Sequence, residues 1–150
     1  MNPETLFTLC GRLALVGWIL LIVAPRWRWS AQVVAKFVIP LALAAVYVGV
    51  ISTHIGGSRG GFSSLAGVAE LFSDRWILLA GWVHYLAFDL FVGAWEVRDA
   101  GRVGVPHWLV VPCLLLTFLF GPAGLLAYAI VRGVRTRRRL FDTRQRNPLS

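Results

Sequence analysis

The chain has 150 residues, of which 57% are hydrophobic and 15% are charged, and its mean hydropathy is +0.69. A soluble domain of this length exposes more polar surface than such a composition supplies, which excludes that class. Four windows are long and apolar enough to cross the roughly 30 Å hydrocarbon core of a bilayer. They nearly fill the chain, so we expect an all-α protein, a four-span transmembrane helical bundle.

The formal charge of +8 does not indicate nucleic acid binding. Most of it comes from arginines near the C-terminus, which are Arg132, Arg135, Arg137, Arg138, Arg139, Arg144 and Arg146. A basic block just after a membrane helix is typical of a topology determinant that binds anionic lipid headgroups. We therefore expect a membrane domain at 1–131 and a basic cytoplasmic tail at 132–150, with anionic lipid and no nucleic acid as its partner.

Two small-residue stripes mark the first two expected spans, Thr5–Ala24 and Val33–Thr53. The first stripe is Cys10, Ala14 and Gly17, and the second is Ala42, Ala45 and Gly49. Small residues at helical spacing let helices approach closely, so these two spans are predicted to pack together. Pro40 is expected to kink the second span, because proline removes one backbone hydrogen bond.

The connection Ile55–Asp74 contains a pattern typical of a short helix that does not span the membrane. Leu65, Val68 and Phe72 share one helical face, while Glu70 points away from it. This pattern predicts a short amphipathic helix between spans two and three that lies on the membrane surface or caps the bundle.

The third expected span, Trp76–Trp95, carries His84 and Asp89 in its interior. A charged side chain at membrane depth costs at least about 2.5–3.5 kcal/mol, so it needs a partner and a reason to be there. Glu96–Arg102 reads as a solvated, charged turn. The fourth span, Trp108–Val131, is free of charge and contains the Gly121-Pro122 pair, which is expected to bend or open it.

Four spans place both chain ends on one side of the membrane. Arg59, Arg75 and the tail arginines outnumber the basic residues expected on the other side. The positive-inside rule therefore predicts an inner (cytoplasmic) membrane protein with both termini in the cytoplasm.

The polar residues of the third span define a candidate site. Trp82, Tyr85 and Asp89 fall on one face, and His84 lies about 140° from Asp89 around the helix. We expect Arg12, Tyr47 and His84 at similar depths, with Arg12 and Asp89 as the main intramembrane ion pair. The alternative is structural: an ion pair that only fixes helix register, and a His84 that bonds a backbone carbonyl.

Metal binding has little support. His54, His84 and His107 belong to different depths, and no HxxxH or ExxH spacing occurs. We therefore expect no metal and no cofactor.

Two segments resemble the abscisic-acid-deficient-four-like family of small four-span membrane proteins. They are Gly81-Trp-Val-His-Tyr-Leu-Ala-Phe-Asp-Leu-Phe-Val-Gly-Ala-Trp95, followed by Arg98-Asp99, and Phe120-Gly-Pro-Ala-Gly-Leu125. The resemblance covers roughly residues 5–131. The plant member of this family is required for making the xanthophyll neoxanthin in plastids. This chain shows no plastid transit segment and ends in an arginine tail, so it resembles a bacterial-type member.

The resemblance implies carotenoid or isoprenoid chemistry. Converting an epoxy-xanthophyll to an allene needs an acid to open the epoxide and a base to take a proton, without net redox change. Asp89, His84, Arg12 and Tyr47 are the predicted catalytic residues of such an isomerase-like enzyme. The predicted ligand-binding residues are Trp82, Tyr85, Phe88 and Trp95.

Two other classes of function stay open at this point. One is a non-enzymatic subunit or assembly factor of a membrane pigment–protein complex, with other membrane subunits as partners. The other is a small transporter, which ranks last because no pair of interrupted spans repeats.

Overall fold

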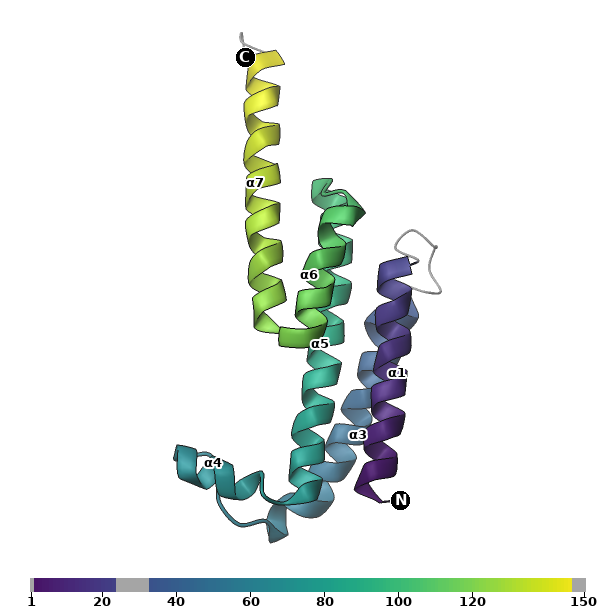
Figure 1. Ribbon diagram of the computed structural model, residues 1–150, viewed down its shortest axis with the longest axis vertical. Helices are drawn as coiled ribbons and strands as arrows, with labels where there is room; N and C mark the ends of the chain where they lie inside the picture. Colours follow the sequence, from purple (N-terminus) through teal and green to yellow (C-terminus); the bar gives the residue numbers. More distant parts are fainter. Residues whose placement is uncertain (1, 24–32, 147–150) are drawn as a thin grey trace.

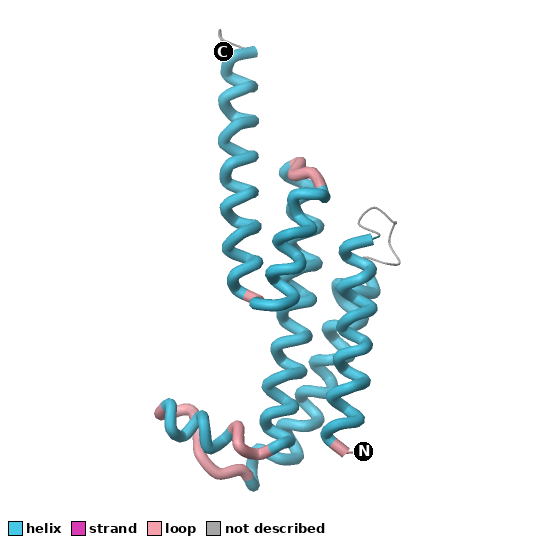
Figure 2. Tube along the Cα trace, viewed as in Figure 1, coloured by secondary structure: helices cyan, strands magenta, loops and turns pink. Residues whose placement is uncertain are grey.

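The computed structural model describes residues 2–23 and 33–146, and every regular element in these ranges is a helix (Figures 1 and 2). In chain order they are α1 (Pro3–Val23), the π-helix η1 (Val34–Val38), α3 (Ile39–His54), the 3-10 helix η2 (Ile55–Gly57), α4 (Leu65–Leu71), α5 (Arg75–Val103), α6 (His107–Phe120) and α7 (Pro122–Arg146). The predicted all-α class is confirmed.

The long helix α5 is the axis of the fold, because α1, α3 and α6 all pack against it. It starts at Asp74, whose Oδ1 accepts hydrogen bonds from the backbone N–H groups of Trp76 (2.7 Å) and Ile77 (3.3 Å). It ends at Gly104, which has the positive φ of 70° that favours glycine. The helix thus runs about two turns beyond Trp95, through the segment predicted as a solvated turn.

Helix α1 packs on α5 through the predicted stripe, since Cys10, Ala14 and Gly17 are all buried. A Cβ on Gly17 would lie 2.6 Å from a methyl group of Leu90, so any larger residue would force the Leu90 side chain to move. In return, the indole of Trp18 lies over Gly93, where a Cβ would be 2.7 Å from the ring. Paired glycines therefore bring the two helices into close contact.

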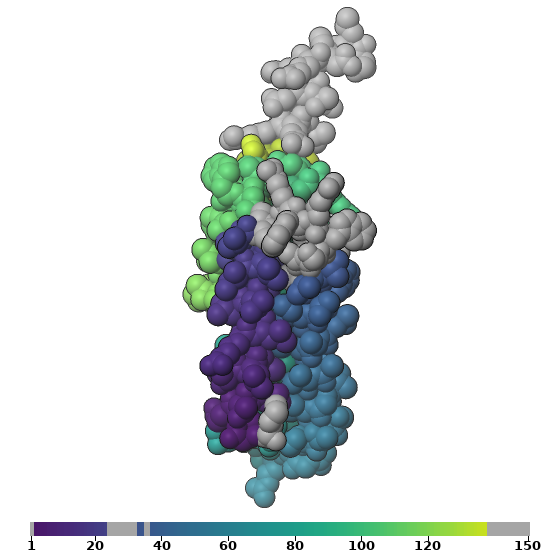
Figure 3. Space-filling view, turned by 90° about the vertical axis from the view of Figure 1, so that its right-hand side faces the viewer, coloured from purple at the N-terminus to yellow at the C-terminus, as the bar shows by residue number. Residues whose placement is uncertain are grey.

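The stripe predicted for the second span is wrong. Ala42, Ala45 and Gly49 are exposed, and α3 buries Ile39, Leu43 and Val50 instead. Large aliphatic side chains make this contact, and they face α5 more than α1. The departure expected from Pro40 is found just before it, where η1 replaces a regular α-helical turn. On the face shown in Figure 3, α1 and α3 lie side by side in front of α5.

The fourth expected span is not one helix. Residues 107–120 form α6, the chain reverses at Gly121, and α7 returns beside α6 (Figure 1). At 1.5 Å per residue, the 14 residues of α6 cover about 21 Å, which is short of the roughly 30 Å of a hydrocarbon core. Among the described residues, three helices are long and apolar enough to cross a membrane: Pro3–Val23, Ile39–Gly57 and Arg75–Val103. These helices are compatible with a membrane protein.

The reversal is built by the glycine and proline residues of the Phe120–Leu125 segment. Gly121 adopts φ 48° and ψ −100°, a conformation that disfavours any side chain. Pro122 opens α7, where its missing N–H costs no helical hydrogen bond. At Gly124, a Cβ would come closer to the backbone nitrogen of Thr117 than the 3.0 Å that real Cβ atoms keep. Gly124 therefore sets the tight contact between α6 and α7.

The predicted short helix between spans two and three is present as α4. Its N-cap is Ser64, whose hydroxyl accepts a hydrogen bond from Gly67 N at 3.0 Å. Leu71 is buried, but Leu65 is 87% exposed, so the helix projects away from α5 (Figure 1). Phe72 anchors it, because its ring occupies the space that a Cβ on Gly81 would need.

The two ends of the described chain lie at opposite ends of the helix assembly (Figure 1). The prediction that both termini share one side rested on four spans, whereas three of the described helices are long and apolar enough to cross a membrane. The expected domain boundary at 131/132 also falls inside the continuous helix α7.

Candidate functional site

Three of the predicted site residues lie along one face of α5. The indole of Trp82 stacks on the ring of Tyr85 with centroids 5.4 Å apart, and it also contacts Phe7 of α1 at 5.6 Å. The Tyr85 hydroxyl donates a hydrogen bond to the backbone oxygen of Phe118 at 3.1 Å. This acceptor lies in the last turn of α6, so Tyr85 joins α5 to the α6–α7 turn.

Asp89 lies one helical turn beyond Tyr85 and faces the α6–α7 turn. A Cβ on Gly121 would be 3.0 Å from Asp89 Oδ1, so the carboxylate lies directly against the reversal. Asp89 Oδ2 is buried and has no hydrogen-bond partner among the described residues. The positive φ of Gly121 favours glycine at this turn, and a Cβ there would also crowd the carboxylate, whose Oδ2 is left without a hydrogen-bond partner among the described residues.

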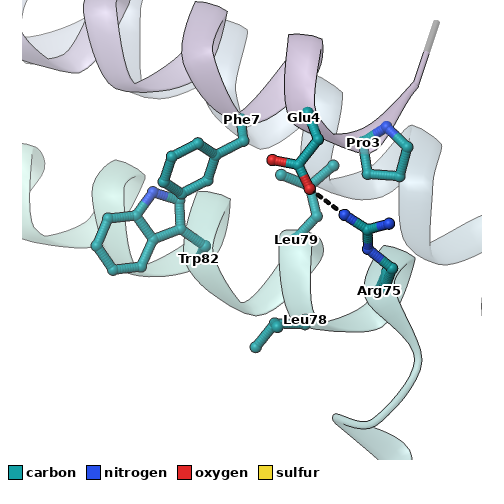
Figure 4. A pocket seen from close by; sticks show the side chains of 7 residues that line it. All are labelled: Pro3, Glu4, Phe7, Arg75, Leu78, Leu79 and Trp82. Carbon is teal, nitrogen blue, oxygen red and sulfur yellow. Dashed lines mark hydrogen bonds and ion pairs between the residues drawn. The ribbon is translucent and has the colours of Figure 1, made fainter.

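A pocket lies at the N-terminal end of the same face, between α1 and α5 (Figure 4). Its volume is about 310 Å³ and its lining is Pro3, Glu4, Phe7, Arg75, Leu78, Leu79 and Trp82. Glu4 and Arg75 form an exposed ion pair across it. Leu78 and Trp82 are 55% and 41% exposed, so this half of the α5 face is open rather than covered by α6 or α7.

The opposite half of this face is covered by α6 and α7 and carries two further acidic side chains. Glu96 is fully buried, and its Oε1 accepts a hydrogen bond from the Thr117 hydroxyl at 3.0 Å. Asp99 Oδ2 accepts hydrogen bonds from the Tyr128 hydroxyl (2.7 Å) and from Arg132 Nε (2.6 Å). The predicted solvated turn is therefore wrong for Glu96, and Asp99 ties α5 to α7.

The signal for Glu96 was in the sequence: it shares a helical face with Asp89 and Gly93. Its partner Thr117 and the Asp99 partner Tyr128 had no such signal. Both lie in the segment expected to be a single span; Thr117 reaches Glu96 through the packing of α6 on α5, whereas Tyr128 reaches Asp99 only because the chain reverses at Gly121.

His84, Tyr47 and Phe88 lie on the side of α5 that faces α3. The imidazole of His84 stacks on Phe88 with centroids 4.6 Å apart and contacts the Tyr47 ring at 5.5 Å. Tyr47 and His84 are therefore neighbours across α3 and α5. They do not join Asp89 in one compact site.

The predicted Arg12–Asp89 ion pair is wrong. Arg12 is exposed on α1, because the buried face of that helix is the one defined by Cys10, Ala14 and Gly17. Among the side chains that the structure describes, Glu4–Arg75 and Asp99–Arg132 form ion pairs, and Arg12 and Asp89 do not.

Trp95 also lies away from Asp89, in an edge-to-face contact with Tyr128 at 5.5 Å. It thus supports the packing of α7 on α5. The described part of the chain contains no cluster of three His, Cys, Asp or Glu side chains that could hold a metal ion.

A second, wholly apolar groove of about 390 Å³ runs between α3 and α5. Phe37, Pro40 and Leu41 line it on one side, and Ala87, Phe88 and Phe91 on the other. This groove lies on the side of α5 opposite Asp89. It has an apolar lining, whereas the pocket beside Trp82 includes the charged residues Glu4 and Arg75.

These features define a class: a helical protein compatible with a membrane, whose central helix carries a half-buried carboxylate at the tip of a short helical hairpin. Comparison with protein families identifies the family within this class. The family model described as ABA DEFICIENT 4-like matches residues 5–128, and the chain belongs to this family. Searches of curated proteins and of solved structures give no significant match.

Proposed function

We propose that α1, α3 and α5 cross the cytoplasmic membrane and that the α6–α7 hairpin enters it only part of the way. Asp89 is the midpoint of α5, and the hairpin turn lies against it, so the turn belongs near the bilayer midplane. Irregular backbone at that depth is tolerated where it is buried in protein, and Gly121, the residue at the reversal, is buried. On this placement the ends of α1 and α7 lie on opposite sides.

The charge distribution then orients the molecule. The end formed by α5 and α7 carries Arg98, Arg102, Arg132, Arg135, Arg137, Arg138, Arg139, Arg144 and Arg146, whereas the end at α4 carries Arg59 and Arg75. The positive-inside rule favours the arginine-rich end in the cytoplasm. The C-terminal arginines remain a proposed binding surface for anionic headgroups there, and the N-terminus lies outside.

We further propose that the face below the hairpin binds a hydrophobic, carotenoid- or isoprenoid-like substrate. The observation that carries this proposal is that the hairpin stops at Asp89 and leaves the aromatic surface of Phe7, Trp82 and Tyr85 open to the lipid. From Arg75 to Asp89 this face is about 21 Å long, at 1.5 Å per residue. An elongated apolar molecule fits such a surface, and its reacting end would lie against Asp89.

The chemistry that suits one buried carboxyl group is proton transfer without a cofactor. In an epoxide-to-allene isomerisation, the carbon–oxygen bond breaks, the oxygen gains a proton, and a neighbouring carbon loses one. Asp89 in its acid form donates the first proton and, as carboxylate, accepts the second, so atoms and charge balance. Tyr85 positions the turn beside it. His84, Tyr47 and Arg12 lie outside this arrangement and are not assigned a step.

A deletion strain complemented with variants tests this proposal. Asp89→Asn, which keeps the shape of the side chain, should yield a folded protein that leaves the isoprenoid and carotenoid profile unrestored in mass spectrometry. Glu70→Gln, which changes an exposed carboxylate on α4, should restore it fully. Full restoration by Asp89→Asn would remove the catalytic role and leave the binding role or a non-enzymatic one.

One observation favours that second candidate, a non-enzymatic subunit of a membrane complex. Arg12 is an exposed cation about 14 Å along α1 from its first residue, with no ion-pair partner among the described side chains. An arginine in contact with lipid at this depth is costly, whereas a partner subunit with an acidic side chain would stabilise it. Site-directed crosslinking from position 12 that captures one defined membrane protein would support this candidate, and capture of lipid alone would argue against it.

A further inference from the structure

A cation, Arg98, lies on α5 beyond the end of the apolar groove between α3 and α5. Arg98 lies seven residues after Phe91, and seven residues turn an α-helix through nearly two full turns. Arg98 is therefore on the same face of α5 as the groove residues Phe91 and Ala87. Its Nε atom is buried and has no hydrogen-bond partner among the described residues. A guanidinium in this position has an unused donor that an anion would satisfy.

The depths of these groups match the dimensions of one lipid leaflet. Arg98 is nine residues beyond Asp89, or about 14 Å along α5, close to the half-thickness of roughly 15 Å of the hydrocarbon core. Phe91, Phe88 and Ala87 lie about 10–17 Å further in than Arg98. The cation is thus at headgroup level, and the apolar groove is at acyl-chain level beneath it.

The groove residues supply no competing polar partner for a ligand. The six lining residues named above for this groove have only hydrocarbon side chains, and η1 shapes its outer wall at Phe37. An acyl chain makes only dispersion and hydrophobic contacts, which is what this lining offers. The other pocket, beside Trp82, differs because its lining includes a cation and an anion, Arg75 and Glu4, which are paired with each other.

We propose that this groove is a specific site for an anionic phospholipid of the arginine-rich leaflet. The lipid phosphate accepts hydrogen bonds from Arg98, and one acyl chain lies in the groove between Phe37 and Phe91. The bound lipid would cover the side of α5 opposite the Asp89 face. This site rests on the proposed placement of α5 in the membrane, but it does not depend on the proposed substrate or on any chemistry at Asp89.

Native mass spectrometry of the delipidated protein tests the proposal with phosphatidylglycerol and phosphatidylcholine as probes. The wild-type protein should retain one phosphatidylglycerol more tightly than phosphatidylcholine. Arg98→Gln should weaken phosphatidylglycerol retention about tenfold, as expected for the loss of a charge-assisted hydrogen bond, and remove the preference. Arg102→Gln, one turn further along α5 and exposed, is the matched control and should retain the preference.

Two more variants separate loss of the site from loss of the fold. Arg98→Lys keeps the positive charge and should keep part of the preference for phosphatidylglycerol. Ala44 also lines the groove, so Ala44→Trp fills it with a large side chain. This variant should reduce retention of both lipids while Arg98 is unchanged. Equal retention by the wild type, Arg98→Gln and Ala44→Trp proteins would overturn the proposal, as would occupation of the groove by an uncharged isoprenoid in place of phospholipid.

Discussion

The contact between α6 and α7 at Gly124 gives the sharpest prediction about the fold. Gly124→Ala adds a Cβ closer than 3.0 Å to both the backbone nitrogen and the hydroxyl of Thr117. A backbone atom does not move aside as a flexible side chain does, so α7 has to shift away from α6. Overpacking of this kind typically costs about 1–3 kcal/mol, and the preference of helices for alanine over glycine returns up to about 1 kcal/mol.

Because the Cβ would lie 2.1 Å from a backbone nitrogen, the cost is at the upper end of that range, so the expected net loss is about 2 kcal/mol, which for a chain of this size corresponds to a fall in Tm of about 4–8 °C. Thermal unfolding of the purified protein in mild detergent, followed by loss of the monodisperse peak, measures this. Gly133→Ala on the same helix is the control, because no heavy atom lies within 4 Å of its Cβ position. It should leave Tm unchanged or raise it slightly. Equal Tm values for the two variants would refute the hairpin packing.

Three further predictions concern other parts of the molecule. Reporter fusions placed before Pro3 and after Ser150 should report opposite sides of the membrane; a cytoplasmic signal from both would restore the four-span arrangement. Truncation after Arg132 retains the Asp99–Arg132 ion pair, so it should leave Tm nearly unchanged while binding to anionic liposomes falls; a large fall in Tm would show that the remaining tail packs on the bundle. Arg12→Leu should not lower Tm, because Arg12 is exposed and has no partner in the described structure, and a loss of several kcal/mol would revive the predicted ion pair with Asp89.

Hydrophobicity and helical periodicity were enough to predict the helical class, α1, α5 and the short helix α4. The stripe on α1 was predictable because close approach requires small residues, and Gly17 and Gly93 meet that requirement. The stripe on α3 was not, because Ala42, Ala45 and Gly49 are equally compatible with exposure to lipid. In a membrane-like composition, hydrophobicity no longer distinguishes a buried face from an exposed one.

The hairpin was missed because residues 108–131 satisfy the length and apolarity of a single span. Gly121-Pro122 was expected to bend or open that span, but a bend and a full reversal share the same residues. What decides between them is tertiary: the contact of Gly124 with Thr117 and that of Gly121 with Asp89. The candidate site depended on this choice, since the reversal places Gly121 against Asp89 and pairs Asp99 with Tyr128.

Photo-crosslinking can identify what occupies the open face of α5 beside Phe7, Trp82 and Tyr85, and this tests the proposed substrate most directly. A photoreactive phenylalanine analogue at Trp82 samples this face, and the same analogue at Leu126, which is 63% exposed on α7, samples ordinary lipid contact. After irradiation in the native membrane, mass spectrometry identifies the adducts. We expect an isoprenoid- or carotenoid-class adduct at position 82 that is absent at position 126. Identical phospholipid adducts at the two positions would contradict the account.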